Sequence, residues 1–208
     1  PPVLFDSKME EIRQDLAVLR SMNARAFIIS NLGHLAIIEE TQTGKKGKKP
    51  AIFADYHLNC LNTQTENQLK NLGLNGVVLS IENSERNLKR VMGLSGPIDR
   101  LLYIYGRPAL FNSRFLLKNL KENTVVESPR RERFRLRFEP DTVKVFAERP
   151  IFFGPLLKSK SLAGVKALII DLEFDPHPLS TAREVKKAIT RGQSLKGTSK
   201  FNFHRGLF

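Results

Sequence analysis

Short uninterrupted runs of hydrophobic residues recur along this 208-residue chain, and polar residues follow each run. Strands buried on both faces of a parallel sheet have this continuous apolar character. Polar side chains at the carboxyl ends of such strands are where α/β proteins bind ligands. The pattern therefore predicts a parallel sheet with a site at one end. The expected strands cover residues 26–30, 51–54, 76–80, 101–105 and 167–170.

Apolar residues at helical spacing fill most of the segments between these strands. Met9, Ile12 and Leu16 are the first example, with charged residues between them. Strands and helices that alternate at this rhythm predict an α/β arrangement built from βα units. Residues 58–73 are expected to pass from a strand into a helix, and further helices are expected over residues 34–43, 84–93, 156–162 and 181–190.

Several helix ends are marked by residues that cap or stop a helix. Asp6 or Ser7 is placed to cap the first helix, and Asn83 or Ser84 to cap the helix over residues 84–93. Gly73 is placed to end the helix before it.

After Arg107 the period of the pattern changes to two. Arginines alternate with apolar residues, and a Glu139-Pro140-Asp141 turn separates them from a second alternating segment. This pattern predicts a basic β-hairpin over residues 130–148, with its apolar side packed on the sheet and its basic side facing water. The alternating residues are Arg133, Phe134, Arg135, Leu136, Arg137 and Phe138.

The fold prediction follows from the number of strands. Six candidate parallel strands, counting one over residues 3–5, are fewer than the eight of a closed barrel. We therefore predict a partial or distorted TIM-like α/β barrel with the hairpin appended, forming a single domain over residues 1–208. Because the chain begins at Pro1 without a leader segment, we expect it to be a fragment of a longer chain.

Charge and cysteine content limit the partners and cofactors. The net charge is +13, which favours a polyanionic partner such as RNA, and the alternative is that the charge serves solubility alone. No apolar run is long enough to span a membrane, so no membrane partner is expected. The single cysteine, Cys60, excludes a disulfide framework and argues against an iron–sulfur cluster. We predict no cofactor and a reducing, cytoplasmic setting.

The first candidate site residues follow the strand over residues 51–54. If the strand continues, Asp55, His57 and Asn59 share one face, and a histidine oriented by a carboxylate can act as a general base or bind an anion. The alternative is a structural histidine at the turn into a helix. Glu82 is a candidate second carboxylate or a helix-start residue. Cys60 is interpreted as core rather than as a nucleophile.

Asp171 and Glu173 are the second carboxylate candidates, because they too would share one strand face. With His177 they could hold a divalent cation, but no metal-ligand spacing supports this, so no metal site is predicted. Arg107 and Arg114 could clamp a carboxylate or phosphate, or else pair with Glu82 or Asp171.

Two further groups complete the candidate set. Asn31, at the end of the first strand, joins Asp55, Asn59, Arg107, Arg114 and Glu173 as a substrate-binding candidate, whereas His57, Glu82 and Asp171 are the catalytic candidates. Arg133, Arg135 and Arg137 could track a nucleic-acid backbone. The alternative for these arginines is protection of an exposed strand edge.

Several phrases at strand ends resemble the later part of the collagenase-like peptidase family, U32. They are His57-Leu58-Asn59 with Asn62, Leu72-Gly73 leading to residues 78–82, Tyr105-Gly106-Arg107-Pro108 with Leu110, and Arg205-Gly206. The resemblance implies a barrel-like α/β fold, peptidase activity, and kinship with members linked to hydroxylation of RNA bases or of a quinone precursor.

The chain departs from this family in two ways. Residues 113–117 stand where the family has a cysteine-bearing segment, and the family's amino-terminal strands have no counterpart here. Activities that depend on those cysteines, including those of an iron–sulfur cluster, are therefore not expected of this piece.

Three functions remain open at this point. The first, which explains both the matching phrases and the missing parts, is the substrate-binding part of a larger peptidase-family enzyme that is not proteolytic alone. The second is an RNA-binding module of an RNA-modifying protein. The third is a metal-dependent hydrolase that uses His57, Glu82, Asp171 and Glu173. The expected partners are accordingly the rest of the parent chain and a peptide or RNA substrate.

Overall fold

The computed structural model describes residues 3–41, 49–115, 120–129, 131–155 and 164–200. The chain forms two compact units. Of the described residues, the first unit comprises 3–41, 49–102 and 164–168, and the second comprises 103–115, 120–129, 131–155 and 169–200. The helix expected over residues 156–162 and the Arg205-Gly206 phrase lie outside the described residues.

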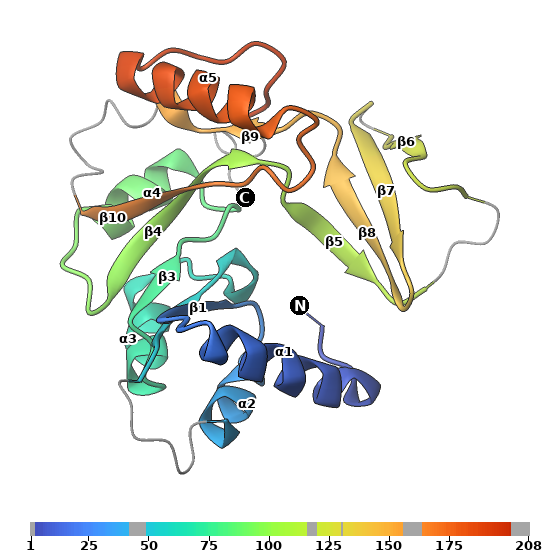
Figure 1. Ribbon diagram of the computed structural model, residues 1–208. Helices are drawn as coiled ribbons and strands as arrows, with labels where there is room; N and C mark the ends of the chain where they lie inside the picture. The colour runs from blue at the N-terminus through green and yellow to red at the C-terminus, as the bar shows by residue number, and fades with distance from the viewer. Residues whose placement is uncertain (1–2, 42–48, 116–119, 130, 156–163, 201–208) are drawn as a thin grey trace. The chain divides into compact units, whose positions relative to one another are not determined.

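A parallel sheet forms the centre of the first unit, as the continuous apolar runs predict. Its strands β1 (Ala26–Ile29), β2 (Ala51–Ala54), β3 (Gly76–Val78) and β4 (Asp99–Gly106) pair in that order, each parallel to the next (Figure 1). Strand β4 continues into the second unit, where it pairs antiparallel with β9 (Ile151–Phe152), and β10 (Val165–Ile170) is its other neighbour in the sheet.

The helices of the first unit alternate with its strands. In chain order they are α1 (Met9–Ser21), α2 (His34–Glu40), α3 (Thr63–Asn71) and α4 (Glu85–Met92). The sheet is not closed into a barrel among the described strands, so the predicted α/β fold with an incomplete barrel is confirmed. No helix of the described segments has the length and apolar character needed to cross a bilayer.

Two of the predicted helix ends are confirmed, and two N-terminal predictions are wrong. The Ser84 side chain accepts a hydrogen bond from the Asn87 backbone N–H, which caps α4, and Gly73 adopts φ +84° after α3. Asp6 and Ser7 instead lie inside a short 3₁₀ helix, η1 (Asp6–Lys8), so neither caps α1. Residues 3–5 are not a strand, since they pair with no other strand of the described chain.

A buried ion pair lies in the core of the first unit. Arg100 on β4 and Glu66 on α3 are 4% and 0% exposed, respectively. The guanidinium donates two hydrogen bonds to the carboxylate, of 2.7 Å from Nε and 2.8 Å from Nη2, and a third to the Leu94 carbonyl. Because both charges are paired in two-pronged geometry, their removal from water is offset by strong hydrogen bonds.

An antiparallel sheet dominates the second unit. Its strand order is β5 (Ala109–Ser113), β8 (Thr142–Ala147), β7 (Arg133–Glu139) and β6 (Val125–Glu127), and these strands lie side by side in Figure 1. The predicted hairpin is therefore present as β7 and β8, whereas β5, β6 and β9 were not predicted. Helix α5 (Pro178–Arg191) confirms the expected helix over residues 181–190.

Candidate functional site

The segment after β2 does not continue as a strand. Tyr56–Leu58 forms a single 3₁₀ turn, η2, and the Asp55 carboxylate accepts a 2.5 Å hydrogen bond from the backbone N–H of His57. Asn59 follows in the left-handed conformation and is exposed. The prediction that Asp55, His57 and Asn59 share a strand face is therefore wrong, because the Asp55 side chain caps a turn at this point.

Asp55 and His57 nevertheless form a tightly bonded pair. His57 Nδ1 lies 2.7 Å from Asp55 Oδ1, and the Ser30 hydroxyl donates to Asp55 Oδ2 at 2.8 Å. The Tyr56 ring stacks on the imidazole with 4.1 Å between ring centroids. Burial opposes ionisation of Asp55, but the hydrogen bonds from His57 and Ser30 outweigh it and hold the pKa of this carboxyl below its usual value.

The other nitrogen of the same imidazole is buried without a hydrogen-bond partner among the described residues. Because the Asp55 carboxylate can only accept, it favours the tautomer with the proton on Nδ1, which leaves His57 Nε2 as an acceptor. A buried acceptor without a partner costs free energy, which a ligand donor can recover. Nε2 has almost no accessible surface in this structure, so the pair can bind a donor group or accept its proton once the side chains that cover it move.

The remaining candidates of the first unit have structural contacts. Asn31 Oδ1 accepts from the Gly33 backbone N–H at 2.8 Å, which closes the turn into α2. Glu82 is half-buried, two residues before the Ser84 cap of α4, and its backbone N–H donates to the Ser80 hydroxyl.

Cys60 is fully buried, and its thiol contacts the Asn62 carbonyl. Burial, reinforced by the charge of Glu66, raises the pKa of the Cys60 thiol to about 12. Since the thiolate is the reactive form, this cysteine is not prepared for nucleophilic attack.

The carboxylates of the second unit also lie beyond their strand. Strand β10 ends at Ile170, so Asp171 and Glu173 do not share a strand face, and that prediction is wrong. Asp171 instead accepts from the Glu173 backbone N–H at 3.0 Å and from the Tyr103 hydroxyl at 2.8 Å. Glu173 itself is exposed. No cluster of three or more His, Cys, Asp and Glu side chains in the described ranges is arranged to hold a metal.

Gly106 explains how the chain passes close to Asp171. This glycine adopts φ +146°, and a Cβ atom there would collide with the Tyr103 hydroxyl and lie 2.7 Å from Asp171 Cβ. The glycine in the Tyr105-Gly106-Arg107-Pro108 phrase is therefore required by close packing.

Arg107 is held by backbone carbonyls rather than by a carboxylate. Its Nε donates to the Glu148 carbonyl at 3.4 Å, and its Nη1 to the Phe174 carbonyl at 3.3 Å. The suggested pairing with Asp171 is therefore not what the structure shows. Arg114 is exposed at the end of β5.

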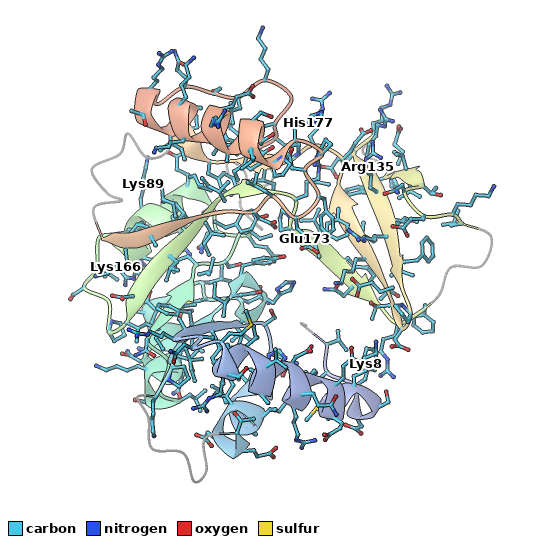
Figure 2. The ribbon with its side chains drawn as sticks, in the orientation of Figure 1. Lys8, Lys89, Arg135, Lys166, Glu173 and His177 are labelled. Carbon is cyan, nitrogen blue, oxygen red and sulfur yellow. The ribbon has the colours of Figure 1, made fainter. Side chains whose placement is uncertain are left out.

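The arginine face of the hairpin is more enclosed than the sequence indicates. Phe146 is the cross-strand neighbour of Arg135, is only 6% exposed, and packs edge-on against Phe174 at 4.9 Å. The Arg137 guanidinium lies 4.3 Å from the centre of the Phe174 ring. The expectation that this face is turned to water alone is therefore wrong. Figure 2 marks Arg135 on β7 and His177 at the start of α5.

These side chains surround a pocket of about 310 Å³ in the second unit. It brings together Arg107, Arg135 and Arg137, which the sequence placed in separate candidate groups, with Asn123, Phe146 and Phe174. Sequence reasoning missed the last three. The hairpin turn could have located Phe146, because Glu139 pairs with Thr142 and the register then sets Arg135 opposite Phe146.

Comparison with known proteins bears on the first half of the chain. Residues 2–115 match the model of a family described as peptidase family U32. Searches among curated proteins and among solved structures found no match. The matched region includes the Asp55–His57 pair and ends at Phe115, after the Tyr105-Gly106-Arg107-Pro108 phrase. Since the match covers more than half of the 208 residues, the chain belongs to peptidase family U32.

Proposed function

We propose that this chain is the substrate-binding part of a larger collagenase-like peptidase of family U32, and that it does not cleave peptide bonds alone. The observation that carries the proposal is the Asp55–His57 pair, whose Nε2 is a buried acceptor without a partner in the described part of the chain. A backbone N–H of a bound peptide is a donor that would complete it.

The arrangement around His57 favours binding over nucleophilic catalysis. In a serine-protease triad the histidine lies between the serine and the carboxylate. Here the carboxylate of Asp55 lies between Ser30 and His57, so the serine proton is donated to Asp55 and not to the imidazole. Cys60 is the chain's single cysteine, and its raised pKa removes the other familiar nucleophile.

Direct binding and cleavage assays test this proposal. The purified chain should bind an acetylated, amidated fluorescent peptide but release no fragments from casein or gelatin. His57→Ala should weaken peptide binding by roughly three- to tenfold, the effect of one hydrogen bond. His177→Ala, which removes an exposed imidazole, is the matched control.

Two outcomes would contradict the proposal. Absence of binding for any peptide would refute the substrate-binding role. Casein turnover that His57→Ala abolishes would show that the chain is a complete enzyme, and loss of that turnover with a chelator would assign it to a metal-dependent hydrolase.

RNA binding is the second candidate, since Arg133, Arg135 and Arg137 share one face of β7 and are 56%, 45% and 43% exposed in their side chains. If they contact phosphates, changing all three to Ala should flatten the salt dependence of RNA binding by roughly two to three units, about 0.7 to 0.9 for each contact. An unchanged slope would leave this face without a role in RNA binding.

A further inference from the structure

The pocket in the second unit has a charged rim and an apolar floor. Arg107, Arg135 and Arg137 come to it from two segments, one after β4 and one on β7. Phe146 and Phe174 supply aromatic surface beside them. A ligand that uses both parts must carry a negative charge next to a large apolar group.

Two of the three guanidinium groups are held in place before any ligand binds. Arg107 donates to two backbone carbonyls, and Arg137 lies over the Phe174 ring at 4.3 Å. A planar guanidinium that is already oriented can donate two parallel hydrogen bonds to a carboxylate, and its side chain loses little conformational freedom on binding.

The nearest acidic side chains leave much of this charge available. Arg135 is 3.9 Å from Glu148, and Arg137 is 3.9 Å from Glu122, which are longer than hydrogen bonds. Glu148 lies closer to Arg133, at 3.1 Å. Among the described residues, Arg135 and Arg137 therefore face carboxylates at a distance, and Glu148 has a nearer partner. Arg107 also interacts electrostatically with Asp175.

The apolar floor and the size of the pocket separate a peptide from RNA. A phosphate backbone needs an extended basic track and makes no use of buried aromatic surface such as Phe146, which is 6% exposed. The pocket volume of about 310 Å³ is near the lower limit for ligand-binding sites. A pocket of this size can hold the side chain of one large residue.

We propose that this pocket binds the C-terminal carboxylate of a peptide whose last residue is large and apolar. Arg135 and Arg137 donate hydrogen bonds to the carboxylate, and Phe146 and Phe174 contact the side chain of the last peptide residue. This inference rests on the proposed role in peptide binding and adds a preference for a free C-terminus. It concerns only the second unit and is independent of His57.

The test compares two fluorescein-labelled hexapeptides, Gly-Ala-Gly-Ala-Ala-Phe with a free carboxylate and the same sequence with a C-terminal amide, by fluorescence anisotropy. The free acid should bind roughly tenfold or more tightly, because charge-assisted hydrogen bonds are lost in the amide. The double change Arg135→Gln with Arg137→Gln should remove this difference. The control, Arg133→Gln, changes an arginine on the same strand face that does not line the pocket.

Each other outcome has a distinct meaning. Equal binding of acid and amide, unaffected by the double change, would overturn the pocket assignment and leave the proposed function standing. Absence of binding for both peptides would overturn the pocket assignment, and the proposed function would fail with it only if the acetylated, amidated peptide of the first assay did not bind either. If Arg133→Gln weakened binding as much as the double change, or if an RNA oligonucleotide displaced the peptide, the site would be a general polyanion surface. Binding of free N-acetylphenylalanine as tightly as the hexapeptide would assign the pocket to small carboxylates instead.

Thermal unfolding of each variant shows whether a loss of binding reflects misfolding. If the double variant unfolds early, the acid and amide comparison in the unchanged chain still decides the question, because it alters only the ligand.

Discussion

The two units of this protein differ in the ionisable groups that their described residues bury. In the first unit Glu66, Arg100 and His34 are each less than a tenth exposed, and Asp55 is largely enclosed by its partners. Other charges of this unit, such as the Lys89–Glu85 pair, lie at the surface. The second unit keeps its arginines half-exposed around a pocket. A buried charge must be paired, so removing its partner strongly destabilises the fold, whereas an exposed charge contributes little to stability and remains available for a ligand. The comparison predicts different responses to mutation in the two units.

The largest expected effect is on the buried ion pair. Glu66→Ala leaves Arg100 buried without its partner and should lower the free energy of unfolding by about 3 to 5 kcal/mol. Urea denaturation followed by circular dichroism measures this loss. The surface pair of Lys89 with Glu85 is the control, and Lys89→Ala should cost less than about 1 kcal/mol. Equal losses in the two variants would show that the buried pair is no more important for stability than a surface pair.

The next effect concerns His34, which is 7% exposed and whose two ring nitrogens have no partner among the described residues. Burial lowers its pKa from 6.5 to about 4. The unfolded chain therefore binds a proton that the folded chain does not, so stability is full above about pH 6.5 and is lost as the pH falls toward 4.

That loss should amount to on the order of 3 kcal/mol in the wild type and be absent in His34→Leu. Urea titrations at several pH values measure it, and the change of stability with pH is the quantity to compare. His177→Ala should behave as wild type. If His34→Leu kept the wild-type change of stability between pH 6.5 and 4, His34 would not be the residue responsible for it.

A smaller effect is expected at Asp55, in a lower pH range. The folded-state pKa of Asp55 is below its ordinary value of 3.8, so its stabilising contribution is present above that pH and lost as the pH falls through the folded-state pKa. Asp55→Asn should cost about 1 to 2 kcal/mol at pH 7 through weaker capping and hydrogen bonds. The difference from wild type should shrink as the pH falls below 3.8 and through the folded-state pKa. Glu173→Gln, at an exposed carboxylate of the second unit, is the matched control.

The smallest effects should be those of the hairpin arginines on stability. Arg137→Ala removes the contact with Phe174 and should cost about 0.5 to 1 kcal/mol. Arg133→Ala breaks an exposed ion pair and should cost less than about 1 kcal/mol. Thermal unfolding measures both. A loss comparable with that of Glu66→Ala would erase the distinction between the two units.

Local signals in the sequence were sufficient for most of the elements. The apolar runs located β1 to β4, Ser84 and Gly73 marked helix ends, and the alternation around Pro140 located the hairpin. These features depend on residues within a few positions of one another, so periodicity and capping reveal them. The two errors at the candidate carboxylates arose where a short polar side chain closed a turn at the end of a strand, as Asp55 does for η2 and Asp171 does after β10. Such a turn competes with continued strand pairing, and the hydrophobic pattern alone cannot distinguish the two.

The sequence by itself determined the α/β class, the alternation of helices with β1 to β4, the β7–β8 hairpin, and the residue types available for a site. Only the tertiary structure decided which of them meet. Glu66 and Arg100 are 34 positions apart, and Arg107 reaches the pocket of Arg135 and Arg137 only through its carbonyl contacts to Glu148 and Phe174. Contacts between such distant side chains depend on how sheets and loops pack, and that packing is set by the whole core rather than by residues adjacent in the sequence.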